Sequence, residues 1–180
     1  MRVFFGAVFI AFAVVELVIL VQLKRKKQKT GFRATALSFS LITLLTAAVY
    51  LFDLKISFFI MILAVISAFL DSYIGYYLDY YKSSKVIDRW LHCYTTFALS
   101  LLLYNIIILV MEEGGSKAFR ALFILILGIA LGAVHEILEF VADIRQNSHM
   151  QKGLKDTNLD IIFNVIGSVL AAVAAYFAML

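Results

Sequence analysis

The sequence predicts an all-α membrane protein, a polytopic bundle of six transmembrane helices in a single transmembrane domain, residues 1–180. Hydrophobic residues make up 63% of the chain, and its mean hydropathy is +0.96. A soluble core of this size could not bury so much apolar surface. The apolar residues also form long runs without the alternation of membrane β-strands, so helices are the expected spanning elements.

Six apolar runs are each close to the roughly 20 residues that a helix needs to cross the hydrocarbon core. We expect the spans at residues 3–23, 34–52, 56–78, 86–111, 118–141 and 159–180. The first run is followed by four consecutive basic residues, at positions 24–27. A cleaved signal peptide carries its positive charge before the apolar region, so we interpret this run as a retained helix.

Lysine and arginine are distributed unequally between the two ends of these spans. If the loop after the first span is cytoplasmic, twelve of the sixteen basic residues lie at cytoplasmic ends and four lie on the outer side. Cytoplasmic loops of membrane proteins carry an excess of Lys and Arg. We therefore expect a multi-pass protein of the cell membrane with both termini outside. The connection between the second and third spans is short, and a re-entrant pair there would change the orientation of the later spans.

The acidic residues gather at the end of the spans that the basic residues mark as cytoplasmic. Eight of the twelve lie there: Asp71, Asp79, Asp88, Glu136, Glu139, Asp143, Asp156 and Asp160. Carboxylates in or near a bilayer are costly, and they usually lie where they have partners, a cavity or a cation. Acids on several helices at the same depth therefore predict a polar site.

Helical spacing places these polar residues on common faces. Residues three or four apart share a face of a helix, which groups Asp88 with His92, Glu136 with Glu139, and Asp156 with Asp160 and Asn164. These stripes lie on the fourth, fifth and sixth spans near one membrane surface. The arrangement is what a water-filled or metal-filled pocket between helices would need.

Carboxylates and imidazoles on neighbouring helices are suitable ligands for a divalent metal. Carboxylate oxygens with one or two imidazole nitrogens can hold Mn²⁺, Zn²⁺ or Mg²⁺, and such an ion can polarise a phosphoryl group or generate hydroxide. We expect His92, Glu139 and Asp160 to bind this ion. Without a metal, the same crowded carboxylates could relay protons or admit a cation, and the spacing alone does not choose between these chemistries.

Three further carboxylates and one arginine lie beside the expected metal ligands. We expect Asp88, Glu136 and Asp156 to be catalytic residues, and Asp88 lies one helical turn before His92, where it could orient the imidazole. Arg89 is expected at the rim, where its guanidinium could bind a substrate phosphate through two parallel hydrogen bonds. Alternatively, acids at the span ends pair with nearby basic residues, and Asp156 caps the sixth span.

Two features lie apart from these stripes. Glu16 lies inside the first span, about two turns from its inner end, and it could either join the polar site or extend to the interface. Gly128, Gly132 and Gly167 lie on apolar faces, where small residues allow helices to approach closely. We expect these glycines to pack helices within one chain rather than to form a dimer.

Three blocks of the sequence resemble a known family. They are IDRWLH at 87–92, HEILEF at 135–140 and KDTNLD at 155–160, followed by Asn164 and Gly167. Their order and spacing are similar to those of the YjdF-type bacterial inner-membrane proteins and, more distantly, the VanZ-like proteins linked with glycopeptide resistance. The resemblance covers roughly residues 86–170 and matches the family pattern at Asp88, Arg89, His92, Glu136, Glu139, Asp156, Thr157, Asp160 and Gly167.

The sequence departs from that family pattern at two positions. His135 stands where an aromatic residue is usual, and Phe140 stands where Trp is usual. The resemblance therefore supports the location of the site and implies no particular reaction or substrate.

The polar site and its surroundings predict an enzyme of the membrane. We expect a metal-assisted enzyme that acts at the cytoplasmic face on a lipid-linked or phosphorylated amphiphile, with membrane lipids as partners and no nucleic acid. One alternative is a small proton- or cation-coupled transporter, and another is an accessory membrane subunit with a structural polar cluster. The outer halves of the fourth and fifth spans are nearly free of polar residues apart from Asn105, which favours a one-sided site over a path through the bundle.

The charge distribution makes a prediction about topology. Single cysteines at Lys27 and Gln151, in a chain without Cys93, should react with a membrane-impermeant maleimide only from the cytoplasmic side. A cysteine at Lys117 is the control and should react from the outside. Labelling of Lys27 or Gln151 from the outside would overturn the orientation.

Overall fold

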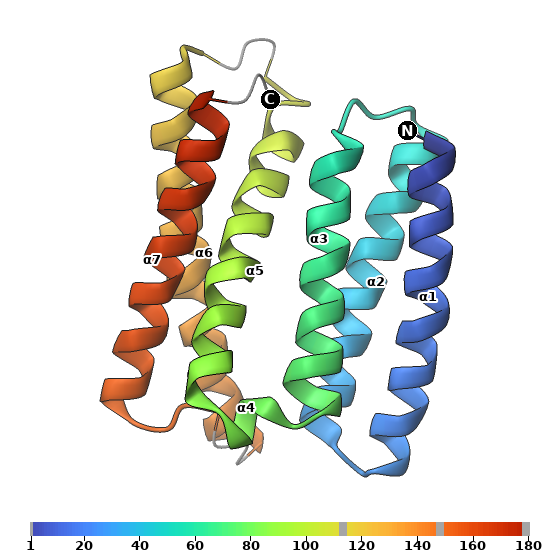
Figure 1. Cartoon of the computed structure of the whole chain (residues 1–180), viewed down its shortest axis with the longest axis vertical. Helices are drawn as coiled ribbons and strands as arrows, with labels where there is room; N and C mark the ends of the chain where they lie inside the picture. The colour runs from blue at the N-terminus through green and yellow to red at the C-terminus, as the bar shows by residue number, and fades with distance from the viewer. Residues whose placement is uncertain (1, 112–114, 147–149, 178–180) are drawn as a thin grey trace. The chain divides into compact units, whose positions relative to one another are not determined.

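The computed structural model describes residues 2–111, 115–146 and 150–177, which form helices and their connections with no strand among them (Figure 1). Within these ranges, six helices are long and apolar enough to cross a membrane. The predicted fold class, an all-α polytopic bundle with six spans, is therefore confirmed.

The helices extend beyond several of the predicted apolar runs. They are α1 (Arg2–Arg25), α2 (Lys29–Leu51), α3 (Phe58–Leu70), the π-helix η1 (Asp71–Tyr77), α4 (Tyr80–Ser83), α5 (Lys85–Ile107), α6 (Lys117–Gln146) and α7 (Leu154–Phe177). Hydropathy marks only the apolar part of a helix, so α7 begins five residues before the predicted start at 159. Conversely, α5 ends at Ile107 rather than at 111. The predicted end at 180 lies outside the described residues.

The chain divides into two compact units, Met1–Ser83 and Ser84–Leu180. The N-terminal unit contains α1, α2, α3, η1 and α4, and the C-terminal unit contains α5, α6 and α7. A single transmembrane domain stays a prediction, and each unit is described here by itself.

Part-way along the third predicted span, in the N-terminal unit, the α-helix α3 is followed directly by the π-helix η1. The backbone N–H of Leu78 donates to the carbonyl of Tyr73, five residues earlier, at 2.9 Å, which is the wider turn of a π-helix. This turn places Ser72 against α1, where its hydroxyl donates to Glu16 Oε1 at 2.5 Å. The Glu16 side chain is only 1% exposed. The alternative in which Glu16 extends to the interface is therefore wrong.

The C-terminal unit is held together by close contacts along α7, which packs against both α5 and α6. A Cβ atom added at Gly167 would lie 2.1 Å from the backbone carbonyl oxygen of Cys93 on α5. One added at Gly132 of α6 would lie 2.6 Å from the Asn164 Cβ. These glycines allow α7 to approach its two neighbours, as predicted for packing within one chain.

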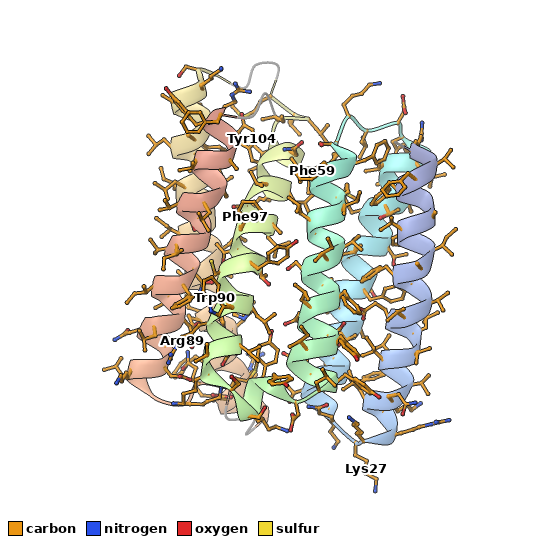
Figure 2. The ribbon with its side chains drawn as sticks, in the orientation of Figure 1. Lys27, Phe59, Arg89, Trp90, Phe97 and Tyr104 are labelled. Carbon is orange, nitrogen blue, oxygen red and sulfur yellow. The ribbon has the colours of Figure 1, made fainter. Side chains whose placement is uncertain are left out.

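The distribution of exposed and buried side chains in α6 is the reverse of that in a soluble helix. Ile137 and Leu138 are 59% and 62% exposed, whereas their neighbour Glu136 is 5% exposed. An outward apolar surface suits contact with lipid, and an inward carboxylate needs partners inside the unit. Figure 2 shows Arg89 and Trp90 near one end of α5 and Tyr104 near the other.

The contact at Gly167 makes a prediction about stability. Gly167→Ala should lower the melting temperature of the detergent-purified protein, because the new methyl group meets a backbone atom that cannot rotate away, and overpacking of this kind costs roughly 1–3 kcal/mol. Gly6→Ala is the matched control, since its Cβ would meet only the Tyr50 hydroxyl, at 3.2 Å. Equal melting temperatures for the two variants would contradict the packing described for α7.

Candidate functional site

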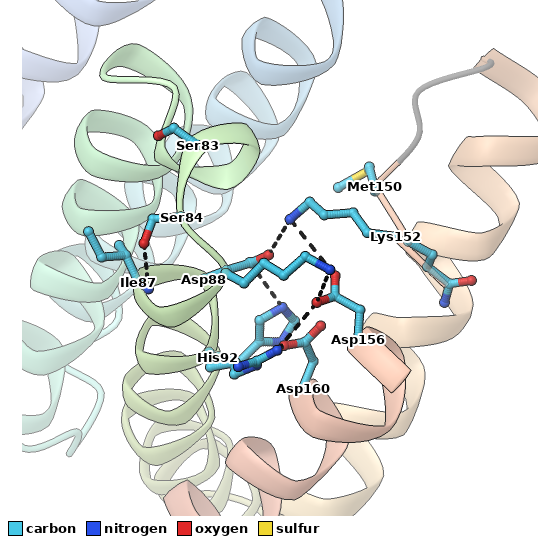
Figure 3. A network of polar contacts seen from close by, with 12 residues as sticks. Ser83, Ser84, Ile87, Asp88, His92, Met150, Lys152, Asp156 and Asp160 are labelled. Carbon is cyan, nitrogen blue, oxygen red and sulfur yellow. Dashed lines mark hydrogen bonds and ion pairs between the residues drawn. The ribbon is translucent and has the colours of Figure 1, made fainter. Parts of the chain in front are cut away.

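Buried acidic side chains from three helices meet at one end of the C-terminal unit, where α5 begins, α6 ends and α7 begins. Figure 3 shows Asp88 of α5 near Asp156 and Asp160 of α7. We call this set the carboxylate cluster, and its members are Asp88, Glu136, Glu139, Asp156 and Asp160. Each of the five residues is at most 9% exposed, and so is His92 among them. The structure thus brings together all six predicted carboxylate and histidine site residues.

The start of α5 is fixed by a local hydrogen bond. The Ser84 hydroxyl accepts the backbone N–H of Ile87 at 3.4 Å, as an N-cap residue does. Asp88 then falls in the first turn of α5, and Asp156 falls in the first turn of α7. A helix N-terminus favours negative charge, so the backbone contributes to holding these two carboxylates. Asp156 lies inside α7, which begins at Leu154, so the alternative that it caps this helix is wrong.

His92 lies at the centre of the carboxylate cluster. Its Nδ1 is 3.8 Å from Glu136 Oε1, and its Nε2 is 3.6 Å from Asp88 Oδ1 and 3.8 Å from Glu139 Oε1. These separations are too long for hydrogen bonds. They are close to the spacing of atoms that share one ion at about 2.1 Å.

Three cationic side chains contact the cluster. Lys152 Nζ is 2.7 Å from Asp88 Oδ2 and 3.9 Å from Asp156 Oδ2. The other contacts are 3.4 Å from Lys85 Nζ to Asp156 Oδ1, 3.5 Å from Arg89 Nη2 to the same oxygen, and 4.0 Å from Arg89 Nε to Asp160 Oδ1.

The charges of the cluster and its contacts are unequal. In the part of the chain that the structure describes, five buried carboxylates face these three cations. If all five carboxylates are ionised, two negative charges are left, which is the charge that one divalent cation would neutralise.

Two carboxylate oxygens of the cluster accept no hydrogen bond. They are Glu136 Oε1 and Asp160 Oδ1, and both are buried. A buried charged oxygen without a hydrogen bond costs free energy unless it binds a proton or a cation. These two atoms therefore call for a proton or a cation at this position.

Three groups of side chains in the described residues could each hold a metal ion. They are His92 with His135 and Glu139, His92 with Glu136 and Asp160, and Asp88 with Asp156 and Asp160. In each group the ligand atoms lie within 4.8 Å of one another. The expected ligand set of His92, Glu139 and Asp160 is thus divided between the first two groups, and the individual roles stay predictions.

Residues 150–152, just before α7, contact the cluster, and their backbone is held by Asp143. The Asp143 carboxylate accepts the backbone N–H groups of Met150 at 2.6 Å and Gln151 at 2.9 Å. The Gln151 amide donates to the Glu136 carbonyl at 3.0 Å. Asp143 is one of the eight acidic residues predicted at the cytoplasmic span ends, and in the structure its carboxylate holds this backbone segment. Pairing of the acids with nearby basic residues was the predicted alternative, and the structure shows such a pair at Lys152, whose Nζ lies 2.7 Å from Asp88.

Deeper in the unit, buried polar side chains bond to one another or to carbonyls of their own helices. Thr96 donates to the Asn164 side-chain oxygen at 2.7 Å, about one turn deeper than His92. Further along α5, Asn105 donates to the carbonyl of Leu101 in its own helix. Ser100 and Ser168, which are also buried, likewise donate to carbonyls of their own helices.

The comparison with known families assigns the chain. Residues 5–180 match the family described as predicted membrane protein (DUF2238). The chain belongs to this family. The family is one of predicted membrane proteins, which agrees with the six helices that are long and apolar enough to cross a membrane.

One relative of this DUF2238 protein is an uncharacterised protein of Thermotoga maritima. The two are 33% identical over 111 residues, which are 61% of this chain and 58% of the relative. The chain thus matches less than two thirds of that protein. No solved structure matches.

Proposed function

We propose that this protein is a membrane-embedded enzyme that binds a divalent cation in the carboxylate cluster and acts on a lipid-linked or phosphorylated amphiphile. The observation that carries the proposal is the pair of buried oxygens, Glu136 Oε1 and Asp160 Oδ1, which accept no hydrogen bond. Both belong to a group of possible ligands that His92 completes. A cation at this place would satisfy both atoms and neutralise the charge left by the surrounding ion pairs.

The donor atoms favour Mn²⁺ or Zn²⁺, with Mg²⁺ as a further candidate. One imidazole nitrogen and two carboxylate oxygens make a mixed set, which suits these ions better than Ca²⁺. His92 Nδ1 faces Glu136, so we assign the cation to this nitrogen. Nε2 then carries the ring proton and faces Asp88 and Glu139. These two carboxylates would orient the imidazole, as carboxylates beside metal-bound histidines do.

A bound cation would supply a Lewis acid for a phosphoryl group. Proton transfer and binding of the substrate phosphate would then be roles of other residues at the site. Asp156 is held by Lys85 and Arg89, and in the proposed reaction its carboxylate accepts a proton from water. Arg89 is one-fifth exposed, so its guanidinium can turn from Asp156 to a substrate phosphate. Glu136, expected as a catalytic residue, is here proposed as a ligand.

The surface beside Arg89 favours an amphiphile over a soluble phosphate ester. Trp90, the next residue on α5, is 60% exposed and packs edge-to-face on Phe163 of α7, with ring centroids 5.5 Å apart. Tryptophan is enriched where a membrane protein meets the interface. A substrate with its apolar chain along Trp90 would bring its headgroup to Arg89 and the cluster.

A proton- or cation-coupled transporter is the second candidate, and Glu16 is the observation that favours it. This carboxylate lies within a membrane-spanning helix of the N-terminal unit, and buried acids in such helices often belong to ion or proton pathways. The one-sided position of the cluster favours the enzyme. The cytoplasmic orientation, the accessory-subunit alternative and the resemblance to YjdF-type and VanZ-like proteins stay predictions.

The proposal predicts phosphate release that depends on the cluster. Purified protein in proteoliposomes, given Mn²⁺ and a phosphorylated amphiphile such as phosphatidic acid or a prenyl diphosphate, should release inorganic phosphate. Glu136→Gln should lower the rate by at least about tenfold, since it removes a ligand charge. Asp53→Asn, a matched change at an exposed carboxylate of the N-terminal unit, should leave the rate unchanged.

The contrary outcome is equally specific. If no phosphorylated amphiphile is cleaved, but the same proteoliposomes accumulate protons or metal ions and Glu16→Gln stops this, the transporter replaces the enzyme.

A further inference from the structure

We propose that the carboxylate cluster contains a second cation position, formed by Asp88, Asp156 and Asp160, and that the Lys152 ammonium occupies it in place of a divalent ion. This inference rests on the proposed function and concerns the regulation and the substrate class of the same site. The first position, assigned above, is formed by His92 with Glu136 and Asp160.

The geometry around Lys152 is that of a cation in a carboxylate site. Its Nζ lies 2.7 Å from Asp88 Oδ2 and 3.9 Å from Asp156 Oδ2 (Figure 3). Asp88, Asp156 and Asp160 are 6%, 3% and 5% exposed, and one oxygen from each lies within 4.8 Å of the other two. Three buried carboxylates are a hard, oxygen-only ligand set, which suits Mg²⁺ or Mn²⁺.

Asp160 links the two positions. It belongs to both groups of ligands, and a carboxylate has two oxygens, so it can bind one ion on each side. Ions that share a carboxylate in two-metal sites lie about 3.5–4 Å apart and hold the attacking and leaving oxygens of a phosphoryl transfer. The pair of positions therefore points to a phosphomonoester or diphosphate headgroup as the reacting part of the amphiphile.

The charges predict when the second ion enters. Five carboxylates face Lys85, Arg89 and Lys152, so if all five are ionised, one divalent cation makes the cluster neutral. Exchange of the Lys152 ammonium for a second divalent ion adds one net positive charge. An anionic headgroup would offset that charge, so the second ion and a phosphate group should stabilise each other at the site.

Lys152 is placed so that its side chain can leave without unfolding its surroundings. The side chain is 22% exposed, whereas the neighbouring backbone at Met150 and Gln151 is held by the Asp143 carboxylate. A lysine has four flexible methylene groups and a strongly hydrated ammonium. Rotation of this side chain into water would open the second position while this backbone stays in place.

The number of ions bound per chain tests this inference. Mn²⁺ binding to the detergent-purified protein should reach one ion per chain in the wild type and two in Lys152→Met at the same free Mn²⁺ concentration. Lys155→Met is the matched control, because Lys155 is exposed and makes no ion pair with the cluster, and it should bind one ion. In these phosphate-free samples, electron paramagnetic resonance should show a coupled pair of Mn²⁺ ions only in Lys152→Met.

A second measurement uses the wild-type chain and does not depend on the folding of a variant. Added inorganic phosphate should raise Mn²⁺ binding from one to two ions per chain, with the coupled-pair signal. One ion in every sample, with and without phosphate, would overturn the second position while leaving the proposed function in place. Binding of no ion in any sample would remove both proposals.

Discussion

Negative charge buried between three membrane helices is the constraint on which the C-terminal unit depends. Five carboxylates converge from α5, α6 and α7 with His92 among them, and only three cationic side chains of the described residues contact them. All six of these residues are at most 9% exposed. They therefore face inward, and the surrounding structure has to supply hydrogen-bond donors, cations or an ion.

Other contacts in the C-terminal unit hold these carboxylates close together and bring a cation to them. Close contact at Gly167 and Gly132 brings α7 near α5 and α6, which sets the distance at which the acids meet. The Asp143 carboxylate accepts hydrogen bonds from the backbone N–H groups of Met150 and Gln151. That segment places Lys152 against Asp88. Helix packing, the backbone at residues 150–151 and the Lys152–Asp88 ion pair are thus all related to the burial of negative charge.

The sequence predicted the parts of this arrangement that depend on local periodicity. The six spans follow from long apolar runs, and the shared faces of Asp88 with His92 and of Glu136 with Glu139 follow from helical spacing. It could not predict which ligands from different helices share an ion, because a rotation of one helix by a few tens of degrees would regroup them. The π-helix was also beyond prediction, since the sequence has no distinct signal for a single wider turn.

Thermal unfolding with and without Mn²⁺ tests most directly whether the cluster is a cation site. The wild-type melting temperature should rise with Mn²⁺, because an ion that binds only the folded chain at a hundredfold excess over Kd contributes about 2.7 kcal/mol. Glu136→Gln should lose that rise, and Asp53→Asn should keep it. The contrary result is a wild-type melting temperature unmoved by Mn²⁺, Zn²⁺ or Mg²⁺, together with an unchanged or higher one for Glu136→Gln. That combination would mean that the substitution relieves repulsion in a network of shared protons.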